Sequence, residues 1–118
     1  MPKNIMDNLK KLAKKNGAIK IEAVGDKNNT PAPYQYNGTR KNFIPDMAVT
    51  FEDRVDLFSI ENSTAKKHMP EMILKWILFS LEARKKGGDF YIAVVKGKED
   101  VFKEIIESKM ISAEVITF

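Results

Sequence analysis

Apolar side chains recur along the chain at spacings that predict three helices and about five strands. Ile5, Leu9 and Leu12 lie one helical turn apart, so residues 3–16 are predicted to form an amphipathic helix. Two further helices are predicted over residues 69–86, which are apolar on nearly every side, and over residues 98–110, which are amphipathic. Alternating or continuous apolar runs predict strands over residues 19–23, 46–51, 57–61, 90–95 and 112–118.

The order of these elements predicts the fold class. The second and third strands are close enough in sequence to form an antiparallel hairpin, and the later strand–helix–strand unit predicts a right-handed parallel crossover. We therefore expect an α/β (α+β) fold with a mixed sheet of about five strands and helices on its faces. Residues 1–118 contain no repeat or linker, so the chain is predicted to be a single domain.

Composition excludes several functional classes. The chain has no cysteine, which excludes disulfides, thiolate metal sites and cysteine nucleophiles and suits a cytoplasmic protein. No apolar signal core follows the first residues. The longest apolar run, inside residues 72–81, is interrupted by Lys75 and is too short to span a bilayer, so no membrane partner is expected.

Positive charge is concentrated in the first part of the chain. Residues 1–43 hold nine Lys and Arg against three acids, +6, whereas residues 44–118 hold eleven against thirteen, −2. A basic region of this kind predicts a polyanionic partner, nucleic acid in particular, although a solvated lysine-rich helix is an equally common explanation. The candidate nucleic-acid contacts are Lys10, Lys14, Arg40 and Lys41.

Residues 26–42 are predicted to be a long loop, and long ordered loops are often functional. Tyr34 and Tyr36 within it are candidates for stacking on bases. The alternative is that these tyrosines cover a sheet edge.

The predicted hairpin brings two carboxylates together. With a four-residue turn at residues 52–55, Val49 lies opposite Phe58 on the apolar face, and Asp46 lies opposite Glu61 on the other face. Like charges placed directly opposite one another destabilise a sheet. A divalent cation, a nearby Arg or Lys, or simple exposure to solvent would offset the repulsion. The charges around the turn, Glu52, Asp53, Arg54 and Asp56, are interpreted as ordinary turn charges.

Pro45-Asp46 on the second strand, followed by Glu61 at the end of the third, resembles the motif of the PD-(D/E)XK nuclease superfamily. The predicted order of elements over residues 3–95 is also similar to the αβββαβ core of that family, whose smallest members include archaeal Holliday-junction resolvases. The helix and strand at residues 98–118 look like an addition at one edge. The resemblance implies a restriction-endonuclease-like fold.

The resemblance also implies a metal site. The family's Asp and Glu bind Mg²⁺, so Asp46 and Glu61 are the implied ligands of Mg²⁺ or Mn²⁺, with the carbonyl oxygen of Asn62 as a third. Glu22, on the polar face of the first strand, is a candidate for the additional acidic ligand that many members carry.

The lysine of the family motif is absent from this chain. That lysine lies two residues beyond the Glu and helps to activate water, but the position is Ser63 here. Some members carry the lysine on another element, and Lys66 and Lys67 are the candidates for a displaced catalytic cation. His68, the only histidine, is a candidate base, although a histidine beside a helix start is more often a surface residue.

The leading hypothesis is a small Mg²⁺-dependent nuclease that hydrolyses phosphodiester bonds in DNA through Asp46 and Glu61. The alternative is a non-catalytic module with the nuclease fold that binds nucleic acid or a partner protein, because Ser63 replaces the motif lysine. A purely structural partner protein is a third hypothesis. A homodimer is also possible, with the edge strand at residues 112–118 as a candidate interface.

Overall fold

The computed structural model describes residues 3–26, 29–35, 42–61 and 69–117. These residues form the three predicted helices, each within two residues of its expected bounds. The helices are α1 (Lys3–Lys15), α2 (Met69–Lys85) and α3 (Glu99–Ser108).

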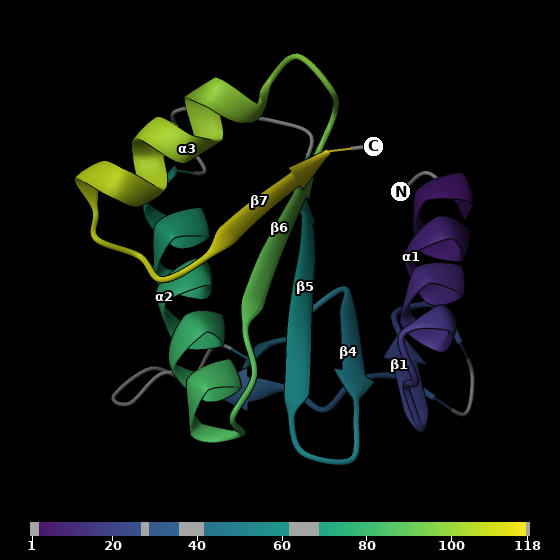
Figure 1. The fold of residues 1–118 in the computed structure, drawn as a ribbon. Coiled ribbons are helices and arrows are strands. Elements are labelled where there is room, and N and C mark those ends of the chain that lie inside the picture. Colours follow the sequence, from purple (N-terminus) through teal and green to yellow (C-terminus); the bar gives the residue numbers. More distant parts are fainter. Residues whose placement is uncertain (1–2, 27–28, 36–41, 62–68, 118) are drawn as a thin grey trace.

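The main sheet has five strands, as predicted, and their spatial order is β1-β4-β5-β6-β7. Their bounds are β1 (Lys20–Ala23), β4 (Met47–Thr50), β5 (Val55–Glu61), β6 (Phe90–Val94) and β7 (Glu114–Thr117). The first three pair antiparallel, whereas β5, β6 and β7 run parallel because α2 and α3 carry the chain back between them (Figure 1). The predicted α+β class with a mixed sheet is therefore confirmed.

The predicted loop at residues 26–42 contains a second, two-stranded sheet. It pairs β2 (Tyr34–Gln35) with β3 (Asn42–Phe43) in antiparallel fashion. Tyr34 packs edge-on against Phe79 of α2, with ring centroids 6.3 Å apart, and belongs to the periphery of the core. The contact shown for this tyrosine is with a helix, whereas the predicted roles are stacking on bases or covering a sheet edge; Tyr36 lies outside the described residues.

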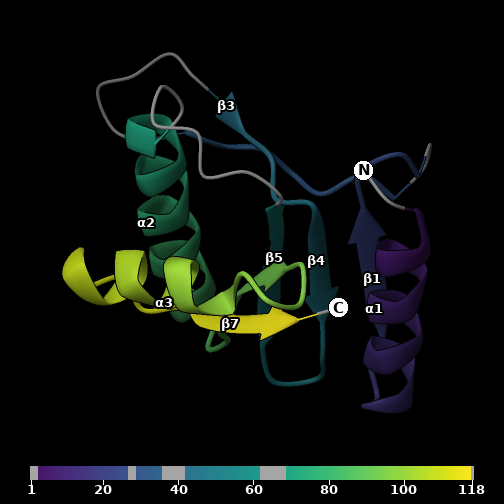
Figure 2. The ribbon, with the colours of Figure 1, turned by 90° about the horizontal axis from the view of Figure 1, so that it is seen from above.

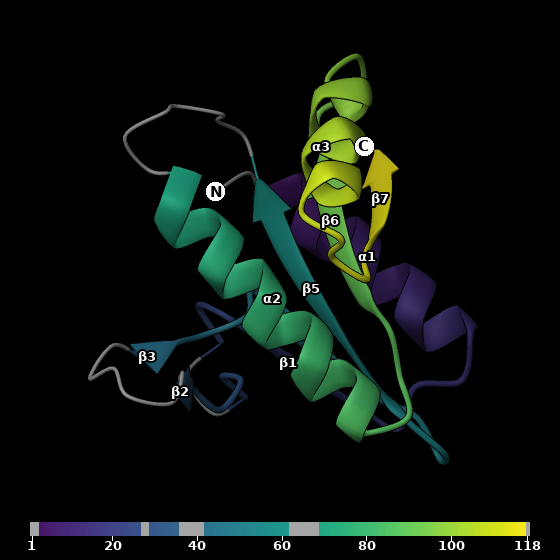
Figure 3. The ribbon, with the colours of Figure 1, turned by 90° about the vertical axis from the view of Figure 1, so that its left-hand side faces the viewer.

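The helices cover both faces of the sheet. Figures 2 and 3 show α2 and α3 on one face and α1 on the other. The core on the α2 side is centred on the fully buried Trp76, Phe79 and Phe102, whereas the core on the α1 side includes Met47 and Val49. This division follows from the strand period of two, which sends alternate side chains of each strand to opposite faces.

Helix α1 lies on the sheet through a stripe that differs by one position from the predicted one. Ile5, Leu9 and Ala13 are buried, but Leu12 is 53% exposed. The buried residues repeat every four positions, so the contact follows a ridge of i, i+4 residues that is inclined to the helix axis and passes beside Leu12. In α2, burial of Trp76, Phe79 and other residues confirms the prediction of a largely buried helix.

The predicted register of the hairpin is wrong by two residues. Met47 pairs with Phe58 and Val49 pairs with Asp56, so Asp46 and Glu61 are not directly opposite one another. The Phe51 N–H donates to the Arg54 carbonyl at 2.8 Å, which leaves only two residues in the turn instead of four. Because the shift is even, each side chain stays on its expected face.

Asp56 explains the difference in register. Its side chain is buried instead of lying in an exposed turn, and its Oδ1 accepts a hydrogen bond of 2.9 Å from the N–H of Asp89, the residue before β6. The Arg54 guanidinium lies 3.5 Å from its other oxygen. A carboxylate with these partners can be buried, and it occupies the position opposite Val49 where the sequence pattern predicted Phe58.

None of the helices in the described part of the chain is long and apolar enough to cross a membrane.

Candidate functional site

Asp46 lies immediately before β4, on the face of the sheet that α2 covers. The ladder between β4 and β5 begins at Met47, and the Asp46 carboxylate continues it by accepting a hydrogen bond of 2.6 Å from the Ile60 N–H on Oδ2. Pro45 precedes it and has no N–H to offer to a sheet. The Asp46 side chain thereby takes the place of a backbone carbonyl as the acceptor for β5, just before β4 begins.

Glu61 is the last residue of β5, and its buried carboxylate faces α2. Its Oε2 accepts hydrogen bonds from the Trp76 indole Nε1 at 2.7 Å and from the Ser59 hydroxyl at 3.0 Å. The Lys75 Nζ lies 2.8 Å from the same oxygen. A buried carboxylate requires partners of this kind, and adjacent residues of α2 supply two of them.

Asp46, Glu61 and Lys75 are electrostatically coupled. Burial raises the pKa of Asp46 above its ordinary value, and the negative charge of Glu61 raises it further. The hydrogen bond from Ile60 and the positive charge of Lys75 lower the pKa, but the net shift is upward. The two carboxylates that the sequence singled out are therefore neighbours through β5, because Asp46 accepts from the Ile60 N–H and Glu61 is the next residue of that strand, and they are not paired directly across the hairpin.

Lys75 is the site residue that the sequence analysis missed. It lies on α2, and its side chain is 23% exposed. The available signal was a lysine interrupting the apolar run within residues 72–81. A lysine in a mostly buried helix requires an acceptor for its charge, and the helix alone does not show that this acceptor is Glu61.

The donor set suits a hard cation. Mg²⁺ takes oxygen ligands and needs only one or two carboxylates when water and substrate phosphate complete its octahedron. Within the described residues, Oδ1 of Asp46 and Oε1 of Glu61 accept no hydrogen bond. These two oxygens are the ones that would hold the metal.

Glu22 does not join this pair. It lies on β1, opposite Ala48 of β4, and its carboxylate is 3.8 Å from the Lys20 Nζ. The described ranges contain no group of three or more acidic or histidine side chains that could hold a metal ion. The predicted third carboxylate is therefore absent from the cluster.

The remaining predicted site residues divide into two groups. Lys10 and Lys14 lie on α1, on the opposite side of the sheet from α2 and Lys75 (Figure 3). They line a pocket of about 330 Å³ beside β1, where the Lys10 Nζ contacts an Asp26 carboxylate oxygen at 2.9 Å. The other predicted residues lie outside the described ranges: Arg40, Lys41, Asn62, Ser63, Lys66, Lys67 and His68.

Comparison with protein-family models, curated proteins and solved structures finds no match to this chain.

Proposed function

We propose that the protein is a metal-dependent nuclease that hydrolyses phosphodiester bonds in DNA at the cluster of Asp46, Glu61 and Lys75. The observation that carries the proposal is the placement of two carboxylates and one ammonium near the end of β5, where one oxygen of each carboxylate accepts no hydrogen bond from the described residues. Buried acidic side chains with perturbed pKa values mark candidate functional sites.

Each residue has a distinct role in this proposal. Asp46 and Glu61 would hold Mg²⁺ or Mn²⁺ through their free oxygens. A bound divalent ion would polarise the phosphate and lower the pKa of a water ligand. Ser59 and Trp76 hold the Glu61 carboxylate in a fixed orientation by donating to its Oε2. That preorganisation lowers the cost of assembling the site for each catalytic cycle.

Lys75 supplies the positive charge that Ser63 lacks. It approaches from α2 and not from β5, and its partial exposure leaves the ammonium accessible to an anionic substrate. An ammonium at this place would offset the charge that develops on the phosphate during hydrolysis. Lys66 and Lys67 remain predictions for the same role.

Cleavage of supercoiled plasmid and of a labelled oligonucleotide tests the proposal. Asp46→Asn and Lys75→Met should each reduce the Mg²⁺-dependent rate at least about 100-fold, the cost of removing one group that stabilises developing charge. Lys85→Met is the matched control, because Lys85 lies on the same helix, is 72% exposed and pairs with Glu82. Its rate should equal that of the parent. Cleavage by Asp46→Asn at the parental rate would contradict the assignment.

A non-catalytic nucleic-acid-binding module is the second candidate, and the contacts of Glu61 favour it. Three donors share its Oε2, so the carboxylate has a complete structural role without a metal. This candidate predicts salt-sensitive binding through Lys10, Lys14, Arg40 and Lys41 without cleavage.

Calorimetric titration with Mg²⁺ and Mn²⁺ distinguishes the two candidates. Binding to the parent that is lost in Asp46→Asn supports the nuclease, whereas nucleic-acid binding without metal binding supports the module. Ser63→Lys adds a second discriminating variant, because it would raise activity only where the carboxylates hold a metal.

A further inference from the structure

The pocket between α1 and β1 is separate from the carboxylate cluster and has a different chemistry. It has a volume of about 330 Å³ and lies beside β1, the edge strand of the main sheet, whose neighbour in that sheet is β4. Three lysines and one acidic residue are among its lining side chains, a formal excess of two positive charges. The pocket is lined by Lys10, Lys14, Ala18, Ile19, Lys20, Ile21, Asp26 and Asn29.

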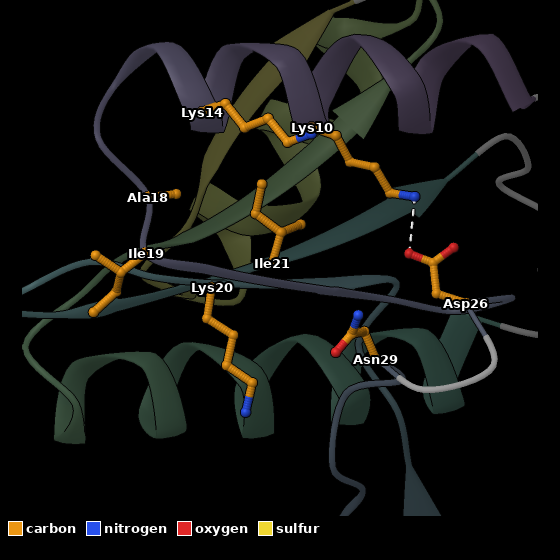
Figure 4. A pocket seen from close by; sticks show the side chains of 8 residues that line it. All are labelled: Lys10, Lys14, Ala18, Ile19, Lys20, Ile21, Asp26 and Asn29. Atoms are coloured by element: carbon orange, nitrogen blue, oxygen red, sulfur yellow. Dashed lines mark hydrogen bonds and ion pairs between the residues drawn. The ribbon is translucent and has the colours of Figure 1, made fainter.

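The lysines approach the pocket from two directions. Figure 4 shows Lys10 and Lys14 extending from α1 on the side of β1 to which Ile21 points, whereas Lys20 leaves the strand on the other side. Lys10 and Lys14 are four residues apart on one helix, so their side chains lie on adjacent turns of the same face. Like charges at that spacing destabilise a helix slightly, and an anion bound between them would remove the repulsion.

The positive charges are only partly neutralised inside the protein. Lys10 forms an ion pair of 2.9 Å with Asp26. Lys20 is 59% exposed and lies 3.8 Å from Glu22, a loose contact. No carboxylate among the described residues forms an ion pair with Lys14. Among the described residues, the pocket thus contains one ammonium without an ion-pair partner, Lys14, and a second, Lys10, whose partner can be exchanged.

We propose that this pocket binds a phosphate group, held by the ammonium groups of Lys10 and Lys14, with Asp26 competing for Lys10. Lysine is a point-charge donor that suits the oxygens of a phosphate. The phosphate has two chemical sources, a phosphodiester of a nucleic-acid backbone or a free phosphomonoester. Recognition requires neither a metal ion nor the carboxylates at the end of β5, so it is independent of the proposed hydrolysis.

Binding is measured by calorimetry at low ionic strength in the presence of EDTA. Adenosine monophosphate is the phosphomonoester probe, and a short oligothymidylate without terminal phosphates is the phosphodiester probe. The parent should bind at least one of them, and the stronger ligand identifies the source. Binding of neither probe would overturn the proposal.

Two matched pairs of variants locate the site. Lys14→Ala should weaken binding about tenfold, the loss of one charge-assisted hydrogen bond. Lys11→Ala removes the same charge from the same helix, but Lys11 does not line the pocket. The affinity of this variant for the phosphate probe should therefore change less than about twofold. Equal losses in the two variants would show attraction by overall charge only and would overturn the proposal.

Neutralising the competing carboxylate should have the opposite effect. Asp26→Asn releases Lys10 from its ion pair and should tighten binding of the phosphate probe several-fold. Asp7→Asn makes the same change in net charge at an exposed position of α1 outside the pocket, and it should change the affinity little. Unfolding followed by circular dichroism confirms that each variant is folded. Unchanged or weaker binding in a folded Asp26→Asn variant would contradict the role assigned to Lys10.

Discussion

Burial controls the chemistry of the individual carboxylates in this protein. Asp46 lies immediately before β4 and Glu61 at the end of β5, and one oxygen of each accepts hydrogen bonds from described residues. For Asp46 the donor found among the described residues is the Ile60 backbone N–H, which offsets only part of the cost of desolvation, and the pKa therefore remains raised. Glu61 has three donors. These differences lead to separate predictions for the two residues.

Asp46→Asn should stabilise the folded protein at neutral pH. A carboxyl group whose pKa is higher in the folded than in the unfolded state binds its proton more tightly when folded. Its ionisation therefore reduces stability as the pH rises above the ordinary value of 3.8. Asparagine stays neutral and keeps an oxygen for the Ile60 N–H.

Thermal melting across the pH range checks this expectation. The variant should melt above the parent at neutral pH, with the difference shrinking as the pH falls toward 3.8. Asp7→Asn, at an exposed position, controls for the change in net charge. A parent that is more stable than Asp46→Asn at neutral pH would contradict the prediction.

Glu61 should act as an obligatory acceptor. Glu61→Leu leaves the Trp76 indole N–H and the Lys75 ammonium without their acceptor, whereas Glu61→Gln retains an oxygen for the indole. We expect Glu61→Leu to be less stable than Glu61→Gln by about 1–3 kcal/mol, the cost of an unsatisfied buried donor. Urea unfolding gives the comparison. Equal stability of the two variants would show that Glu61 has no structural role.

At the scale of elements, the connection from α2 to β6 holds the parallel part of the sheet in register. The Val55 N–H donates to the Lys86 carbonyl at 3.3 Å, and the Leu57 N–H donates to the Asp89 carbonyl at 3.0 Å. Gly88 lies between these contacts and approaches the β5 backbone closely. A Cβ at this glycine would lie 1.9 Å from the Val55 carbonyl oxygen, a distance that no side chain can accommodate.

Gly88→Ala should therefore cost about 3 kcal/mol or more, because a backbone atom and not a flexible side chain blocks the added methyl group. Gly97→Ala is the control, since nothing lies within 4 Å of the added Cβ and only its φ of +101° is unfavourable. That variant should lose about 1–2 kcal/mol. Chemical denaturation of both variants provides the measurement, and an equal loss would argue against the close approach at Gly88.

At the scale of the whole molecule, α1 is the only described helix on its face of the sheet and closes the second core (Figure 2). Leu9 is 9% exposed and packs in that core, whereas Leu12 of the same helix is 53% exposed. The helix also carries Lys10 and Lys14, so its docking creates both the core and one wall of the lysine pocket.

Leu9→Ala should destabilise the protein by about 2–3 kcal/mol, through lost burial and a residual cavity. Leu12→Ala should change stability by less than about 0.5 kcal/mol, because the side chain is already largely in water. Equilibrium unfolding of the two variants checks the orientation of α1. A larger loss for Leu12→Ala would mean that the helix presents the other side to the sheet.

In the hairpin of β4 and β5, the sequence pattern predicted the faces of the strands but not their register. The alternation of Met47 and Val49 with Asp46, Ala48 and Thr50 correctly predicted which side chains share a face of the sheet. The register was wrong because the partner of Val49 is the buried Asp56, whose main hydrogen-bond donor comes from Asp89, distant in sequence. Lys75 was missed for the same reason, since its contact with Glu61 joins two elements.

The sequence by itself determined the three helices, the five main strands and their succession along the chain. These features depend on local periodicity and on residues near one another in the chain. Tertiary structure alone decided the two-residue turn, the burial of Asp56, the place of Lys75 beside Glu61 and the separation of Glu22 from the pair. Each of these depends on contacts between distant segments, whose energies are not encoded in any single stretch of residues.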